Sequence, residues 1–235
     1  MNSNRKTAII VGVLYIAATV AGILSLVGTG PIHAPDYLIN VSANGNQIII
    51  GALFSLIMAV SVAGIGVMMF PILKKQNEAL ALGYVGARIV EAVMFIATVI
   101  SWLLLLILSQ EYVKAGAPDA SYFQTLGTLL LAVSNWVGHV IVDTAVFSLG
   151  ALIFYYLLYQ SKLIPRWLSV WGLIGATLLL AAGLLAAFGF DPLSPILVIL
   201  NLPNAVMEMV LAIWLIVKGF NPSAITSLSV KTDIN

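Results

Sequence analysis

The stretch "NWVGHVIVDTAVFSLGA" (residues 135–151) has the apolar character of a membrane-spanning helix. It nevertheless carries Asn135, His139 and Asp143 at intervals of four, which places them on one face of an α-helix. An imidazole and a carboxylate are costly in the hydrocarbon core, so we expect them to face the interior of a helix bundle. The stretch therefore predicts a membrane protein with a polar site inside it.

The composition of the whole chain points to the same class. Of its 235 residues, 61% are hydrophobic and 8% are charged, against about 25% charged in soluble domains. Several apolar runs exceed the roughly 18 residues that indicate a membrane-spanning helix. The predicted fold is all-α, a polytopic bundle of six transmembrane helices. We expect the spans at about residues 7–28, 47–73, 79–109, 126–159, 165–189 and 196–218.

The chain is expected to form a single transmembrane domain over residues 1–220, because the loops between the spans are short. The polar segment 221–235 is predicted to be a disordered cytoplasmic tail. The longest loop, "TGPIHAPDYLINVSANGN" (29–46), is rich in Pro, Gly and Asn. It is either an ordinary surface loop or a cover over the outer mouth of the bundle.

Basic residues are distributed unequally between the two sides. One side is expected to carry Arg5, Lys6, Lys74, Lys75, Lys162, Arg166, Lys218 and Lys231. The other carries Lys114 with Asp36, Glu111, Asp119 and Asp191. Because short basic loops remain in the cytoplasm, the pattern predicts that both termini are cytoplasmic. The expected location is therefore a bacterial cytoplasmic membrane.

Composition also excludes several kinds of chemistry and partner. The chain has no cysteine, which excludes disulfides, thiolate catalysis and iron–sulfur clusters. Its net charge of +1, with no basic stretch, argues against nucleic acid as a partner. The lipid bilayer is the expected partner, with a small molecule or a cation as ligand. The oligomeric state is left open.

Ionisable residues within the spans recur on helical faces. The third span has such a face in Tyr84, Arg88, Glu91, Phe95, Thr98 and Trp102; the sixth in Asn201, Asn204 and Glu208; and the first in Tyr15, Thr19 and Gly22. With the helical rise of about 1.5 Å per residue, these groups fall in one belt around the bilayer midplane. The predicted binding site consists of Arg88, Glu91, Asn135, His139, Asp143, Asn201, Asn204 and Glu208.

The charges of this belt do not balance. Arg88 contributes one positive charge, and Glu91, Asp143 and Glu208 contribute three negative charges if all are ionised. Such a surplus is untenable at low dielectric constant. It requires protonated carboxyl groups, an imidazolium at His139, a bound metal ion or a cationic substrate.

These choices correspond to three hypotheses of function. The first is proton- or cation-linked transport or binding of a small molecule, because chains of carboxylates and histidines form proton relays. Pro203, between Asn201 and Asn204, is a candidate for an unwound stretch of the sixth span.

The second hypothesis is a metal-dependent intramembrane enzyme. In it His139 and Asp143, completed by Glu91 or Glu208, hold a divalent metal ion as cofactor. The third is a structural polar core without chemistry. The residues leave open whether the protein is an enzyme, and they name no substrate.

The stretches "ARIVEAVMF" (87–95) and "LPNAVMEMVLAIWLIVKGF" (202–220) resemble a family of bacterial six-helix integral membrane proteins classified as a domain of unknown function. The resemblance extends over roughly residues 5–220. It matches an Arg-x-x-Glu pair at Arg88 and Glu91. In the last span it matches Glu208, Met209, Trp214, Leu215, Lys218, Gly219 and Phe220. The resemblance implies six spans and a bacterial inner membrane, but no activity.

Overall fold

A computed structural model describes residues 3–116, 121–191 and 194–234, with all their side chains except those of Ser121, His139, Asp143 and residues 229–234. All regular secondary structure in this part of the chain is helical, and six of its helices are long and apolar enough to cross a membrane. These are α1 (Ser3–Gly28), α3 (Gly45–Leu73), α4 (Glu78–Lys114), the segment Tyr122–Ser161, α7 (Arg166–Ala187) and α8 (Pro195–Val217). The predicted all-α class and the six apolar helices are confirmed.

The fourth membrane segment is not a uniform α-helix. It consists of α5 (Ser121–Asn135), η2 (Trp136–Phe147) and α6 (Ser148–Ser161), which follow one another without a break. η2 is a π-helix of 12 residues, whereas the sequence predicts α-helix throughout. π-Helices are rare, usually limited to one turn and frequent at functional sites. The sequence of η2 does not reveal the π-helix, because nearly all of its residues are apolar, as in a buried α-helix.

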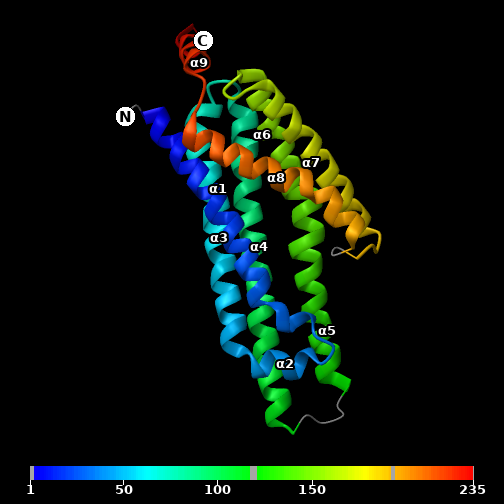
Figure 1. The fold of residues 1–235 in the computed structure, drawn as a ribbon. Helices are drawn as coiled ribbons and strands as arrows, with labels where there is room; N and C mark the ends of the chain where they lie inside the picture. Colours follow the sequence, from blue (N-terminus) through cyan, green and yellow to red (C-terminus); the bar gives the residue numbers. More distant parts are fainter. Residues whose placement is uncertain (1–2, 117–120, 192–193, 235) are drawn as a thin grey trace.

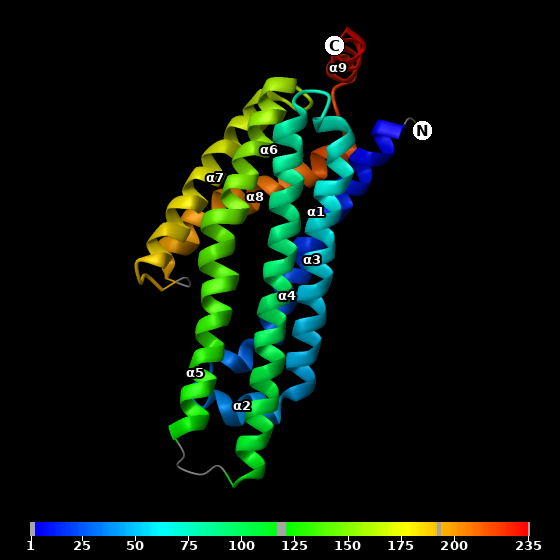
Figure 2. The ribbon, with the colours of Figure 1, turned by 180° about the vertical axis from the view of Figure 1, so that it is seen from behind.

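The helices form an elongated bundle in which the described ends of the chain, Ser3 and Ile234, lie at the same end (Figure 1). Seen from behind, α3, α4 and the α5–η2–α6 segment run side by side (Figure 2). α1 and α8 cross the opposite face, where α1 packs on α3 and α8. α7 packs against α6, η2 and α8. In this arrangement side chains of α1, α4 and α8 meet in the interior of the bundle.

The segment predicted as a loop at residues 29–46 is folded. It contains η1 (Gly30–His33) and α2 (Tyr37–Ala43) at the end of the bundle opposite the termini (Figure 1). Leu38 and Val41 of α2 are buried in a cluster with Leu105 and Leu106 of α4. The segment therefore covers this end of the bundle, as one of the two sequence interpretations expects.

The tail also differs from the expected disorder. It contains α9 (Pro222–Ile234), a helix that stands beside the N-terminal end of α1 (Figure 1). Ala224 and Leu228 of α9 are buried as part of the main hydrophobic cluster. The tail is polar over most of its length, but these two apolar side chains, four residues apart, provide one face for packing.

α1 and α8 approach each other closely at Gly12. A Cβ atom there would lie 2.6 Å from the carbonyl oxygen of Ala212 and 2.6 Å from Cγ1 of Ile216. Small residues allow membrane helices to make such contacts. Arg5 reinforces the pair, since its guanidinium donates hydrogen bonds to the carbonyl oxygens of Leu215 and Ile216 near the end of α8. These carbonyl groups would otherwise lack helical partners.

The proline within α8 does not unwind the helix. Pro203 lies inside α8, which continues from Pro195 to Val217. The expectation of an unwound stretch is therefore wrong. Proline removes one backbone N–H group, and in a membrane helix the neighbouring turns and helices accommodate that loss.

The contact at Gly12 predicts a specific loss of stability. Gly12→Ala places a methyl group against the backbone of α8, and overpacking of this kind costs about 1–3 kcal/mol. We expect a lower melting temperature for the detergent-purified variant, measured by differential scanning fluorimetry.

The control is Gly86→Ala, because a Cβ atom at Gly86 of α4 meets no atom within 4 Å. This variant should melt at the wild-type temperature or above it, since alanine favours helix over glycine. Equal melting temperatures for the two variants would contradict the close α1–α8 contact.

Candidate functional site

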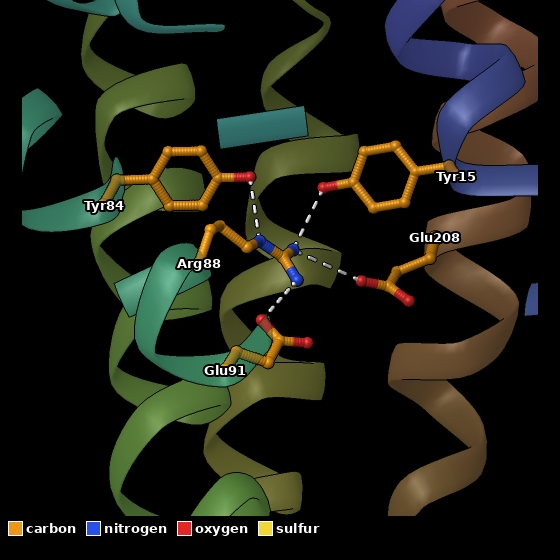
Figure 3. A network of polar contacts seen from close by, with 5 residues as sticks. All are labelled: Tyr15, Tyr84, Arg88, Glu91 and Glu208. Atoms are coloured by element: carbon orange, nitrogen blue, oxygen red, sulfur yellow. Dashed lines mark hydrogen bonds and ion pairs between the residues drawn. The ribbon is translucent and has the colours of Figure 1, made fainter. Parts of the chain in front are cut away.

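The guanidinium of Arg88 lies at the centre of a buried polar cluster (Figure 3). Arg88 is in the third turn of α4, and only 3% of its surface is exposed. Its Nη1 donates to Glu91 at 2.9 Å, its Nε to the hydroxyl oxygen of Tyr84 at 3.2 Å, and its Nη2 to that of Tyr15 at 3.3 Å. Each of the three nitrogens therefore has an oxygen partner.

Aromatic rings surround the same guanidinium. Its central carbon lies 4.9 Å from the ring centroid of Phe147, 5.5 Å from that of Tyr84 and 5.9 Å from that of Tyr15. Cation–π attraction at such distances is strongest where water is excluded. The ring of Tyr84 is itself stacked on Phe154 of α6, with centroids 4.6 Å apart. α1, α4, η2 and α6 thus all contribute to holding Arg88.

Two carboxylates share this one cation unequally. Glu91 lies one turn beyond Arg88 on α4 and is 2% exposed. Glu208 of α8 approaches Nη2 of Arg88 to 3.7 Å, and 16% of its side chain is exposed. Its second carboxylate oxygen points away from Arg88 (Figure 3). Glu91 is therefore the close partner of Arg88, and Glu208 is the looser one.

Glu208, Glu91 and Arg88 border a cavity of about 350 Å³. α1, α3, α4, η2, α7 and α8 all contribute to its lining, which is mainly apolar. Asn201 and Asn204 of α8 also line it. The Oδ1 atoms of these two asparagines are buried and have no hydrogen-bond partner among the described residues. Buried polar atoms are usually paired, so unpaired ones call for a ligand or water.

A second cavity, of about 310 Å³, lies next to the first on the side of η1 and α2. Gly22, Met58 and Phe95 line both cavities and stand between them. The second cavity is rich in hydroxyl groups, from Ser25, Thr29, Ser55, Thr98 and Ser134. Trp102 also lines it, and its indole N–H donates to Ser134 at 2.8 Å. The two cavities form a series between the Arg88 cluster and the η1–α2 end.

The predicted site residues are only partly brought together. Arg88, Glu91, Asn201, Asn204 and Glu208 line the first cavity, as a single site requires. Asn135 instead lines the second cavity. The structure therefore does not bring Asn135 together with the other five residues, because equal depth in the bilayer does not determine which cavity a helix face borders.

The two remaining predicted residues are His139 and Asp143. Their backbone belongs to η2, but their side chains lie outside the described part of the structure. The metal site of His139, Asp143 and Glu91 therefore remains a prediction. The side chains that are described contain no cluster of three or more histidine, aspartate or glutamate residues.

Three aromatic residues of the cluster are not among the predicted site residues: Tyr15, Tyr84 and Phe147. Spacing does place Tyr84 on the same face of α4 as Arg88, four residues before it, and Tyr15 on a face of the first span. It does not show that Tyr15, or Phe147 of η2, contacts Arg88, because these residues come from other helices.

Comparison with protein families found one family model that matches most of the chain. The family model "Domain of unknown function (DUF4386)" matches residues 10–219. The chain belongs to the DUF4386 family. The match includes every residue that lines the Arg88 cavity, and it confirms the resemblance noted from the sequence. Searches of curated proteins and of solved structures each found no match.

Because the Arg88–Glu91 ion pair is buried, we expect that removing one partner lowers the free energy of unfolding substantially. Arg88→Met leaves Glu91 buried without its cation, which typically costs about 3–5 kcal/mol. We expect a strongly lowered melting temperature in detergent. Arg88→Met combined with Glu91→Met should recover part of the loss, because the double variant leaves one carboxylate, Glu208, without Arg88 instead of two.

The control is Lys114→Met, which breaks the Lys114–Glu111 pair of α4. This pair has the same i, i+3 spacing but side chains that are 71% and 57% exposed, so the loss should stay below about 1 kcal/mol. Equal losses for Arg88→Met and Lys114→Met would show that the buried pair does not stabilise the bundle.

Proposed function

We propose that this integral membrane protein binds or transports a small molecule at the Arg88 cavity, coupled to exchange of a proton or cation at Glu208. The observation that carries the proposal is the placement of two carboxylates and one guanidinium on the wall of a cavity. A buried pair of one cation and one anion would be neutral. The third charge is a surplus that must be compensated.

Glu208 is the group best suited to carry the exchange. It is farther from Arg88 than Glu91 is, and it is more exposed to the cavity. Among the described side chains, the other titratable groups near it are Tyr15 of α1 and Tyr155 of α6, which contribute hydroxyl groups. Among the described residues, Arg88 and Glu91 are therefore the charges that Glu208 faces. A proton or a cation can reach Glu208 through the cavity without breaking the Arg88–Glu91 pair.

The second cavity supports transport in preference to static binding. It extends from the Arg88 cavity toward η1 and α2, and Gly22, Met58 and Phe95 narrow the space between the two. Substrate sites of membrane transporters lie near the middle of the bilayer, so a substrate needs a path to the site from one side of the membrane. A purely structural polar core would not require a cavity beside Glu208.

The proposal includes a bacterial cytoplasmic membrane, with both termini in the cytoplasm. The turns that follow α3 and α6 lie at the same end as the described ends of the chain (Figure 1). These turns carry Lys74, Lys75 and Lys162, and Arg166 begins the helix that follows the second turn. The positive-inside rule assigns such an end to the cytoplasm. Under this assignment the second cavity opens toward the outside.

Proton exchange at Glu208 can be tested without knowing the ligand. Infrared difference spectra of the purified protein between high and low pH should show C=O stretching bands of protonated carboxyl groups growing as the pH falls. The chain has nine Asp and Glu residues, so the band of Glu208 is the component that is missing from Glu208→Gln, which keeps the shape of the side chain but cannot ionise.

Glu111→Gln is the matched control, because Glu111 is an exposed glutamate on α4. This variant should keep the band. If the spectra of wild type and Glu208→Gln are the same over the pH range in which both stay folded, Glu208 does not exchange protons and the proposed coupling is wrong.

A further inference from the structure

The chemistry of the cavity walls restricts the class of ligand. Arg88 has few donors left for an anion, since three of its five N–H groups already donate to Tyr84, Glu91 and Tyr15 and Glu91 balances its charge. An anionic ligand would instead face the carboxylate of Glu208. Bringing like charges together at low dielectric constant is strongly unfavourable. The cavity is therefore unsuited to carboxylates and phosphates.

The polar atoms still in need of a partner are hydrogen-bond acceptors. The Oδ1 atoms of Asn201 and Asn204 are buried and unpaired within the described part of the chain, and Asn204 is only 4% exposed. Asn201, Asn204 and Glu208 follow at intervals of three and four, on one face of α8. An unpaired buried acceptor costs about 1–3 kcal/mol. A ligand that donates hydrogen bonds to these atoms removes that cost.

The size and the walls of the cavity exclude a bare metal cation as the best occupant. A volume of about 350 Å³ corresponds to about a dozen water-sized groups of ~30 Å³ each. Hard cations need about six oxygen ligands close around them. Most of the lining is apolar instead, including Ala18, Met58, Val62, Ile65, Phe95 and Leu179.

We propose that the ligand of this cavity is a small organic ammonium cation with an apolar body. Its N–H groups donate to Glu208 and to the free oxygens of Asn201 and Asn204, and its apolar body lies against Met58 and Phe95. The positive charge of the ligand compensates the surplus negative charge of Glu208. This inference rests on the proposed function, since it assigns a ligand class to the same cavity.

Three compounds of similar shape test the assignment: benzylammonium, benzyl alcohol and benzoate. Each is titrated by isothermal calorimetry into the detergent-purified full-length protein at neutral pH. Benzylammonium should bind measurably, and at least about tenfold more tightly than the other two, because only it provides a charge opposite to Glu208. Propylammonium and methylammonium should bind progressively more weakly, since each buries less apolar surface.

Variants of cavity residues test whether benzylammonium binds in the Arg88 cavity. Glu208→Gln and Asn204→Leu are close in size to the wild-type residues, and each should weaken benzylammonium binding by at least about tenfold. Glu111→Gln should leave the affinity unchanged. Melting temperatures establish that each variant is folded. If Glu208→Gln does not fold well enough for titration, Asn204→Leu alone decides the location.

The outcomes separate this inference from the proposed function. If benzoate or benzyl alcohol binds as tightly as benzylammonium, or if no ammonium compound binds, the assigned ligand class is wrong. The proposed function then still stands provided that the carboxyl band of Glu208 responds to pH. If that band is absent from the wild type, the proposed proton coupling fails whatever compound binds. Binding of benzylammonium that is unaffected by both variants places its site outside this cavity and overturns the inference.

Discussion

A guanidinium that is buried in a membrane protein must find its counter-charge and its hydrogen-bond acceptors within the protein, because neither lipid nor bulk water supplies them. Arg88 finds them on three helices: Glu91 and Tyr84 on α4, Tyr15 on α1 and Glu208 on α8. The relative positions of these helices are therefore constrained by one side chain. The arrangement of the remaining site residues depends on how α1, α4 and α8 are positioned around Arg88.

The packing of α1 on α8 positions two of these partners, Tyr15 and Glu208. Gly12 contacts Ala212 about one turn from Tyr15 and from Glu208, so a shift at this contact would move both side chains. Arg5 attaches α1 to the last turn of α8 as well. Close packing between small residues and a buried ion pair thus support each other. Neither the close packing nor the ion pair depends on the hydrophobic effect, which does not drive helices together inside lipid.

Glu91 and Glu208 lie at different distances from Arg88, and this difference determines the charge balance of the cluster. A neutral pair of Arg88 and Glu91 would be a structural element. Adding Glu208 at 3.7 Å, on the wall of a cavity, creates a carboxylate whose charge the described side chains compensate only in part. Nearby acceptors also lack a partner among these side chains, and such a site suits protons and cations better than anions. This is why we favour a cationic ligand over an anionic one, even though an arginine is at the centre.

Much of the fold follows from composition and spacing. Long apolar runs predict six membrane helices because few other structures can cross a bilayer, and the spacing of Arg88 and Glu91 places both on one face of a helix. Spacing does not determine how a helix is rotated against its neighbours. The contact of Phe147 with Arg88 and the position of Asn135 in another cavity were therefore not predictable. The π-helix η2 was not predictable either, because no single residue type requires it.

The central claim is that a proton and a cationic ligand compete for the carboxylate of Glu208. It is tested most directly by counting the protons that an unbuffered solution of the purified protein releases when benzylammonium binds. At a pH where Glu208 is protonated in the free protein, we predict one proton released per cation bound, and none from Glu208→Gln. Binding of benzylammonium to the wild type without proton release, or equal release from Glu208→Gln, would contradict the claim.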